Sequence, residues 1–204
     1  MILVGRYLSP FVRRTAVVLE LLELPYEHRQ LSTADQMEEI KSFNPVGRVP
    51  ALQLDDGEVL VDSGAIIDHL NEIAPADRKV VPAEGRARRD VLYLTAIGHG
   101  AMEKGVYAFY ERTRRPEDKV FEPWLHHLGG QVRGGLEALE EAAAGRRWLV
   151  GDAITLADIT ATCALDFLNV FTPEMLAGLE LTALQALADR CNALPAFSKT
   201  RPQA

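Results

Sequence analysis

Short apolar runs and helical patterns alternate at the start of the chain. Residues 2–7 form an apolar run with the length of a buried strand, and residues 26–31 can form a second strand. Between them, from residue 10 to 23, apolar residues recur at helical spacing on two sides, so this helix is expected to lie between two layers. Two strands joined through one helix by short connections predict a βαβ unit with parallel strands.

A second helix, a hairpin and a third helix follow. Residues 32–35 (Ser-Thr-Ala-Asp) have the form of a capping box in front of the helix-like residues 36–43. Residues 51–54 and 58–61 are short strand candidates, and the Asp-Asp-Gly turn between them predicts an antiparallel hairpin. Apolar residues return to helical spacing over residues 62–74. The predicted order is therefore β-α-β-α-β-β-α.

Long helical patterns then replace the strand-like runs. Residues 86–113 and 117–144 are each long enough for about seven helical turns, with kinks expected at some of their glycines. A further helix is predicted over residues 173–192, and the Leu194-Pro195 pair is expected to end it.

The strongest local signal in the helical half is a pair of capping residues. Thr155 and Asp158 have the spacing of a capping box, which predicts that a helix begins at Thr155. The chain shows no internal repeat and no low-complexity segment. We therefore predict an α/β domain with a mixed sheet over residues 1–76 and an all-α domain over residues 85–204.

Composition and charge narrow the function classes. Of the 204 residues 48% are hydrophobic, which is typical of a globular protein with a core, and the net charge of −7 argues against a nucleic-acid surface. No apolar run approaches the roughly 20 residues that span a bilayer, and no signal peptide is recognisable, so we expect a cytoplasmic protein without a membrane partner. Cys163, Cys191 and the adjacent pair His126-His127 lack metal-ligand spacing, so no metal is expected.

A serine and a proline stand at the start of the first helix. Ser9 is a natural N-cap, and Pro10 suits the first turn, where its missing N–H group is not needed. The Ser9 hydroxyl either only caps the helix or also holds a ligand.

Four segments together resemble the soluble glutathione S-transferases over nearly the whole chain. They are "SPFVRR" at residues 9–14, "NPVGRVPAL" at 44–52, "DSGAI" at 62–66 and "GDAITLADI" at 151–159. The serine-first motif is most similar to the plant and bacterial serine-type classes, with a tau- or omega-like N-terminal motif. The resemblance implies a thioredoxin-like N-terminal domain, glutathione as co-substrate, and a homodimer to which the helix from Arg86 contributes.

The resemblance also implies a glutathione site, with these residues in contact with the tripeptide: Ser9, Phe11, Gln36, Arg48, Val49, Pro50, Asp62 and Ser63. It implies a cis Val49–Pro50 bond that turns the Val49 backbone toward the extended peptide. Ser63, at a helix start, would bind the γ-glutamyl carboxylate, with Asp62 near the amino group. Gln36 and Arg48 would meet the glycine carboxylate, although Arg48 suits a solvent-facing loop equally well.

The chemistry expected at Ser9 is stabilisation of a thiolate. A thiol has a pKa near 8.5, and lowering it by two units requires about 2.7 kcal/mol, which one charge-assisted hydrogen bond and a helix dipole can supply. Ser9 would steady the glutathione sulfur, which attacks the electrophile. Tyr7, at the end of the first strand, is the alternative donor. A serine at this position cannot form a mixed disulfide, so disulfide exchange is not expected.

An apolar stripe with hydroxyls on the helix after Arg86 suggests an electrophile pocket, although such a stripe is also typical of plain core. Its expected members, together with Phe11 from the first domain, are Met102, Val106, Tyr107 and Tyr110. The predicted function is conjugation of glutathione to a small hydrophobic electrophile, as in detoxification. A non-catalytic glutathione-binding or scaffold protein is an alternative, and so is a glutathione-dependent peroxidase, isomerase or dehalogenase, because one thiolate serves all three.

Overall fold

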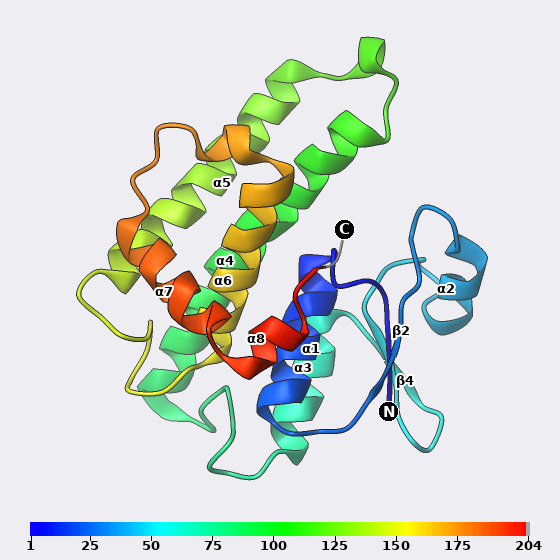
Figure 1. Cartoon of the computed structure of the whole chain (residues 1–204), viewed down its shortest axis with the longest axis vertical. Helices are drawn as coiled ribbons and strands as arrows, with labels where there is room; N and C mark the ends of the chain where they lie inside the picture. The colour runs from blue at the N-terminus through cyan, green and yellow to red at the C-terminus, as the bar shows by residue number, and fades with distance from the viewer. Residues whose placement is uncertain (203–204) are drawn as a thin grey trace. The chain divides into compact units, whose positions relative to one another are not determined.

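The chain divides into two compact units. The computed structural model describes residues 1–202, and Figure 1 shows the strands and helices along the chain. One unit comprises Met1–Val80 with the described residues from Ala193 onward, and the other comprises Val81–Asn192. The first contains a mixed sheet with helices and the second is all helical, which confirms the predicted fold class. Within residues 1–202, no helix is both long and apolar enough to cross a membrane.

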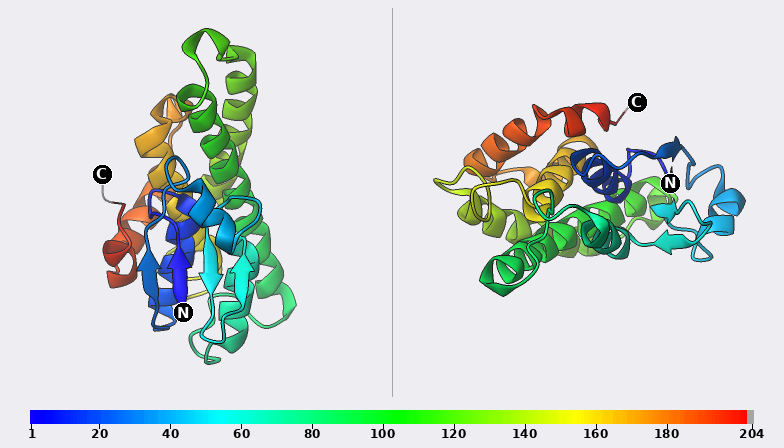
Figure 2. Two further views of the ribbon diagram at one scale, coloured as in Figure 1. Left: turned by 90° about the vertical axis from the view of Figure 1, so that its right-hand side faces the viewer. Right: turned by 90° about the horizontal axis from the view of Figure 1, so that it is seen from below.

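A four-stranded mixed sheet organises the first unit (Figure 2). Its strands are β1 (Ile2–Val4), β2 (Glu27–Arg29), β3 (Ala51–Gln53) and β4 (Val59–Val61), in the spatial order β2-β1-β3-β4. β1 runs parallel to β2 and antiparallel to β3, and β3 pairs with β4 as an antiparallel hairpin. The parallel pair and the hairpin are both as the sequence predicts.

Helices cover both faces of this sheet. They are α1 (Pro10–Leu21), α2 (Met37–Phe43) and α3 (Ser63–Ile73). On one face Ile40 of α2 forms an apolar cluster with Val4, Leu31 and Ala51. On the other face α1 contacts β1 and α3. Every α1 residue from Pro10 to Leu19 is buried, in agreement with the apolar pattern on two sides of this helix.

Two local predictions in this unit were wrong. The first strand was expected over residues 2–7 but ends at Val4, because the backbone at Gly5 has φ 120° and leaves the extended region. The Ser32 hydroxyl does donate to the Asp35 carboxylate at 2.8 Å, but α2 begins only two residues after Asp35. These side chains therefore close a turn in front of the helix instead of capping it.

The C-terminal segment packs on α1 within the first unit. Helix α8 (Pro195–Lys199) begins with the proline that was expected to end a helix, since proline is well tolerated in a first turn. Phe197 of α8 is fully buried, and the Arg13 guanidinium carbon lies 5.9 Å from the centre of its ring. Lys199 donates to the Glu20 carboxylate at 2.9 Å. The last helix thus completes the surroundings of the helix that begins at Pro10.

The second unit is a group of packed helices. They are α4 (Gly85–Thr113), the short 3-10 helix η1 (Glu117–Lys119), α5 (Glu122–Ala143), α6 (Leu156–Phe171), the 3-10 helix η2 (Pro173–Leu176) and α7 (Thr182–Asn192). α4 is one continuous helix, and two of its glycines, Gly98 and Gly105, allow close packing on α6. A Cβ atom at Gly105 would lie 2.3 Å from the Leu168 Cδ2 atom, and one at Gly98 would lie 3.3 Å from the Thr160 Cγ2 atom.

Two of the predicted long helices are interrupted. The pattern over residues 117–144 divides into η1 and α5, and Pro123 stands in the first turn of α5, where proline favours a helix start. The pattern over residues 173–192 divides into η2 and α7, with Gly178 between them at φ 76°. The Glu140 carboxylate of α5 accepts hydrogen bonds from two N–H groups in the first turn of α7, at 2.9 and 2.7 Å.

A buried carboxylate fixes the start of α6, as the sequence predicts. Asp158 is fully buried and takes part in a capping box with Thr155, whose N–H and hydroxyl groups donate to it at 2.8 and 2.9 Å. The Leu149 N–H group donates to its other oxygen at 2.7 Å, so Asp158 also holds the preceding loop. Burial raises the pKa of the Asp158 carboxyl, and these hydrogen bonds oppose that rise.

We expect Asp158→Ala to lower the free energy of unfolding by about 2 kcal/mol, because it leaves buried N–H groups without an acceptor. Urea denaturation followed by circular dichroism measures this change. The exposed Asp152, on the preceding loop, provides the matched control, and Asp152→Ala should change stability by less than about 0.5 kcal/mol. Equal losses in the two variants would contradict this role of Asp158.

Candidate functional site

The backbone at Gly5 brings together a strand end, a helix and a loop. Gly5 follows β1 directly and has φ 120°. A Cβ atom at this position would lie 2.7 Å from the Val12 Cγ2 atom and 2.8 Å from the Val49 Cβ atom, so only glycine fits. The sequence-based list of site residues missed Gly5. A glycine that ends the apolar run "ILV" is the signal that could have identified it.

Ser9 occupies the N-cap position of α1, as predicted. Its backbone is extended (φ −73°, ψ 120°), its carbonyl accepts from the Arg13 N–H group at 2.9 Å, and Pro10 begins the helix. The Ser9 hydroxyl lies 3.5 Å from the Val12 N–H group, at the outer limit of a hydrogen bond. This capping contact is weak, so the partly exposed hydroxyl can turn to another partner at the positive end of the helix.

Tyr7, the alternative to Ser9, directs its hydroxyl elsewhere. This hydroxyl lies 2.8 Å from that of Tyr26, and the Tyr7 ring stacks on His28 with ring centres 3.9 Å apart. Tyr26 directly precedes β2, at the amino end of the parallel strand pair. The Tyr7 hydroxyl is therefore engaged by another side chain, whereas the Ser9 hydroxyl stands at the N-terminus of α1. Burial is the main cause that raises the pKa of both Tyr7 and Tyr26.

The loop before β3 has the predicted cis bond between Val49 and Pro50. Asn44 is buried and holds this loop: its side-chain NH₂ group donates to the Arg48 carbonyl at 2.9 Å, and its oxygen accepts from the Val46 N–H group at 3.0 Å. The Arg48 side chain is exposed to solvent.

Gln36 lies just before α2 and is also exposed. Its side-chain oxygen accepts a hydrogen bond from the Ser32 N–H group at 3.1 Å, so it closes the same turn as the Ser32–Asp35 pair. Its side-chain NH₂ group remains the part suited to an acceptor such as a carboxylate.

Asp62 and Ser63 form the start of α3. Asp62 has φ 71°, which is uncommon for a residue other than glycine, and its carboxylate accepts from the Gly64 N–H group at 2.7 Å. Ser63 is 1% exposed, and its hydroxyl accepts two hydrogen bonds from the Arg14 guanidinium, at 3.0 and 2.8 Å. Arg14 was absent from the predicted site because adjacent arginines on a helix more often indicate a solvated face.

The residues predicted to contact an electrophile have different environments. Phe11 of α1 is 8% exposed, and on α4 Met102 is fully buried and Val106 is 7% exposed. Tyr107 is exposed, with its hydroxyl 3.3 Å from the Glu103 carboxylate. Tyr110 is partly buried, and the Arg114 guanidinium carbon lies 3.9 Å from its ring centre. On α4, Tyr107 and Tyr110 are therefore the predicted residues with open surface.

Metal ligands and reactive thiols are not evident in the described part of the chain. Residues 1–202 contain no group of three or more His, Cys, Asp or Glu side chains that could hold a metal ion. Cys163 and Cys191 are buried, and burial raises the pKa of the Cys191 thiol to about 12. The His127 ring stacks on Trp124.

Comparisons with known proteins agree on one family. Residues 3–78 match the N-terminal domain of glutathione S-transferases, and residues 106–195 match their C-terminal domain. The chain is 32% identical to a maleylacetoacetate isomerase of Pseudomonas aeruginosa, over 79% of this chain and 74% of that protein. It is 29% identical to the uncharacterized GST-like protein YibF of Escherichia coli, over 82% of this chain and 81% of that protein.

Solved structures of similar proteins carry glutathione or a derivative of it. A glutathione transferase family member from Pseudomonas fluorescens Pf-5, with bound glutathione, is 30% identical with a TM-score of 0.85, over 100% of this chain and 99% of that one. A glutathione S-transferase from Methylobacterium radiotolerans, in complex with glutathione sulfonate, is 28% identical with a TM-score of 0.91, over 100% and 95% of the two chains.

We expect the phenols of Tyr7 and Tyr26 to ionise above the ordinary tyrosine pKa of about 10, because burial favours their neutral forms. Since the raised values belong to the folded state, their contribution to stability is lost as the pH rises through them. Absorbance of tyrosinate at 295 nm across an alkaline titration measures this ionisation. Tyr7→Phe should remove tyrosinate absorbance only from the part of the titration above pH 10, and a loss of amplitude at or below pH 10 in this variant would refute the assignment.

Proposed function

Because this chain belongs to the glutathione S-transferase family, we propose that it transfers the glutathione sulfur to a small hydrophobic electrophile. The observation that carries this proposal is Ser9, whose weakly engaged hydroxyl stands at the N-terminus of the twelve-residue helix α1. A sulfur placed there meets an O–H donor and the positive end of the helix dipole, which together favour thiolate over thiol.

The role proposed for Ser9 is stabilisation and not nucleophilic attack. At neutral pH a free thiol with a pKa near 8.5 is mostly protonated, so a shift of about two units, worth roughly 2.7 kcal/mol, makes thiolate the main form. The Ser9 hydroxyl would donate to the sulfur, and the sulfur would attack the electrophile. Ser9 is favoured over Tyr7, because the Tyr7 hydroxyl is bonded to that of Tyr26, whereas the Ser9 hydroxyl stands at the N-terminus of α1.

The remaining predicted residues supply a path for an extended tripeptide within the first unit. The γ-glutamyl end would bind at Asp62 and Ser63, and the backbone at Val49 would pair with the central residue in the manner of an added strand. The glycine carboxylate would lie toward Gln36 and Arg48. On the second unit, the residues proposed for the electrophile that keep open surface are the exposed Tyr107 and the partly buried Tyr110.

Glutathione-dependent isomerisation is the second candidate function. Two relatives favour it: the isomerase of Pseudomonas aeruginosa and a probable maleylacetoacetate isomerase of Vibrio cholerae, which is 27% identical over 100% of this chain and 96% of that protein. The same thiolate would add to a conjugated double bond, allow rotation and leave again. Ser9 has the same role in both reactions, so the electrophile decides between them.

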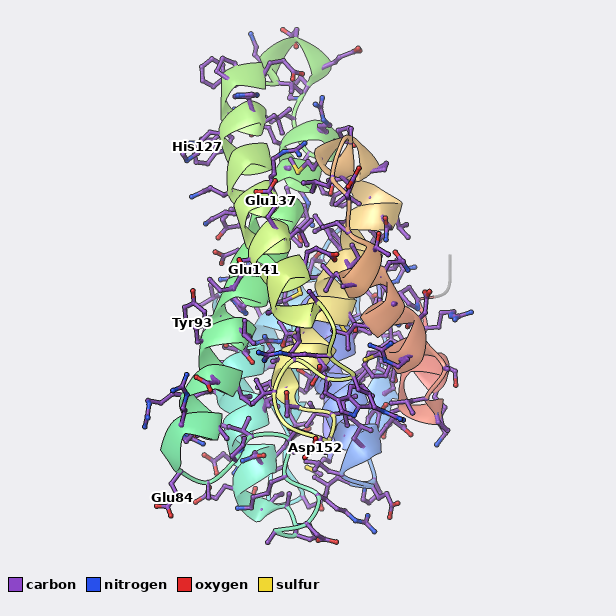
Figure 3. The ribbon with its side chains drawn as sticks, turned by 90° about the vertical axis from the view of Figure 1, so that its left-hand side faces the viewer. Glu84, Tyr93, His127, Glu137, Glu141 and Asp152 are labelled. Carbon is purple, nitrogen blue, oxygen red and sulfur yellow. The ribbon has the colours of Figure 1, made fainter. Side chains whose placement is uncertain are left out.

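A homodimer is proposed as the working form. Leu92 and Tyr93 of α4 are 41% and 64% exposed, which gives this helix apolar surface away from its core. Figure 3 shows Tyr93 and, on α5, His127, Glu137 and Glu141 projecting outward from the second unit. Apolar and aromatic side chains with a polar surround are typical of the core and rim of a protein interface.

We expect Ser9→Ala to raise the pKa of enzyme-bound glutathione by one to two units and to lower kcat/KM near pH 6.5 about 10- to 100-fold, because each unit is a factor of ten in thiolate. Ser9→Thr keeps a hydroxyl and should retain most of the activity. Thiolate absorbance at 240 nm gives the pKa, and turnover of chlorodinitrobenzene gives the rate.

A second substrate, a ketone conjugated to a cis double bond and carrying two carboxylates, measures isomerase activity beside the conjugation of chlorodinitrobenzene. Rapid conjugation with no isomerisation supports the first function, and the reverse result supports the second. Retention on a glutathione column without any turnover would instead indicate a non-catalytic binding protein. Loss of activity in Tyr7→Phe, with full activity in Ser9→Ala, would show that the key hydroxyl was wrongly assigned.

We expect Leu92→Glu to shift the protein from dimer to monomer in sedimentation velocity, because a buried unpaired charge is costly at an interface. Val170 on α6 is 68% exposed and provides the matched control, so Val170→Glu should leave the dimer intact. A monomeric wild-type protein would contradict the proposed assembly.

A further inference from the structure

A histidine from the neighbouring strand holds the turn between β1 and α1. His28 lies on β2, paired with Leu3 of β1, and is partly buried. Its Nε2 atom lies 2.7 Å from the carbonyl oxygen of Gly5, the residue that directly follows β1. The Gly5 N–H group donates to the Arg29 carbonyl at 2.9 Å. Both backbone polar groups of Gly5 are therefore bound to residues of β2.

The chemistry of this carbonyl determines which nitrogen of His28 carries a proton. A backbone carbonyl oxygen has lone pairs and no hydrogen, so it can only accept. The Nε2 atom must therefore be protonated and donate to Gly5, which assigns the Nε2–H tautomer to the neutral imidazole. The imidazolium form donates from the same atom, so the bond is compatible with both charge states.

The ring of Tyr7 keeps the His28 imidazole in place. The two rings are stacked, with their centres 3.9 Å apart and their planes 11° apart. The Tyr7 hydroxyl lies 2.8 Å from the Tyr26 hydroxyl, so the outer end of the Tyr7 ring is held as well. Because stacking favours one relative orientation of two rings, it keeps the imidazole N–H group directed at the Gly5 carbonyl.

The segment that is held in this way leads directly to Ser9. The Ser9 N–H group donates to the Arg6 carbonyl at 3.0 Å, which closes the turn after Gly5. On another side of Gly5, Val12 of α1 and Val49 leave no room for a Cβ atom. A shift of the Gly5 carbonyl would therefore displace the start of α1, and with it the Ser9 hydroxyl.

From this arrangement we infer that His28 is a positioning residue for Ser9, and that the Tyr7 ring acts through His28 by holding its imidazole. The inference rests on the proposed function, because it assumes that the Ser9 hydroxyl donates to the glutathione sulfur. A hydrogen bond weakens steeply as its angle departs from linearity, so a small displacement of the hydroxyl costs thiolate stabilisation. Neither His28 nor Tyr7 touches the ligand.

The test compares glutathione with its thioether. Thiolate absorbance at 240 nm should show that His28→Leu raises the pKa of bound glutathione by about half a unit to one unit, which lowers kcat/KM near pH 6.5 about three- to tenfold. S-methylglutathione has no thiol proton, so its affinity in calorimetry should change by less than about twofold. When combined with Ser9→Ala, His28→Leu should not raise the pKa further, because both changes act on one contact.

Two amide variants separate the donor from its position. His28→Gln places an N–H group near the position of Nε2 and should restore most of the activity, whereas His28→Asn is too short to reach the Gly5 carbonyl and should not. This pair replaces His28→Leu if that variant does not fold. Tyr7→Leu removes the stacked ring and should raise the thiol pKa more than Tyr7→Phe, which keeps it. His126→Leu, at an exposed position on α5, is the matched control and should leave the activity unchanged.

Several results would overturn the inference. An equal loss of affinity for glutathione and S-methylglutathione in His28→Leu would show a merely structural role. Additive effects of His28→Leu and Ser9→Ala would show that His28 does not act through Ser9. In NMR spectra of the imidazole nitrogens, an Nδ1–H tautomer of His28 would contradict the bond to Gly5. If the wild-type protein binds neither peptide, the proposed function itself fails, and the NMR result still tests the bond separately.

Discussion

The close approach of Gly5 to Val12 and Val49 is the constraint on which the first unit depends. At this point the end of β1, the first turn of α1 and the loop before β3 meet with no room for a side chain. Because the chain turns here directly into Ser9 and Pro10, the position of the helix start follows from this contact. A site that uses the dipole at the end of a helix needs that helix end to be held in a fixed position, since the field of the dipole falls off within about one turn.

Each of the two proposed binding ends of the site has a serine hydroxyl whose hydrogen bonds within the fold leave it able to donate to a ligand. At α1, the Ser9 hydroxyl has only a 3.5 Å contact with the Val12 N–H group, so it is weakly committed to its own helix. At α3, the Ser63 hydroxyl is strongly committed as an acceptor to Arg14, so only its proton is left. The first arrangement suits a sulfur anion and the second suits a carboxylate.

Much of the fold could be predicted from the sequence because short local sequence patterns determine it. The parallel pair, the hairpin and the helix start at Thr155 follow from short connections, an Asp-Asp-Gly turn and a capping spacing. Two of the long helices were predicted to be longer than they are, because the spacing of apolar residues continues across breaks that the backbone conformation makes, as at Gly178. Apolar spacing alone carries no information about a positive φ.

Besides the cis Val49–Pro50 bond, which the family resemblance implies, the geometry of the candidate site was predictable where a residue acts on its own helix. Ser9 and Ser63 were expected at helix starts, and both lie there. Gly5 and Arg14 act on residues far along the chain, at Val49 and Ser63, and no local pattern reports a partner 44 or 49 positions away. The hydroxyl partner of Tyr7, which is Tyr26, was missed for the same reason.

The return of α8 to the first unit makes that unit discontinuous in the chain. Phe197, fully buried beside Arg13, is synthesised after the whole second unit. During translation α1 therefore lacks this packing partner until α8 has left the ribosome. The helical unit is contiguous from Val81 to Asn192. It can therefore finish folding before the first unit, although most of the first unit precedes it in the sequence.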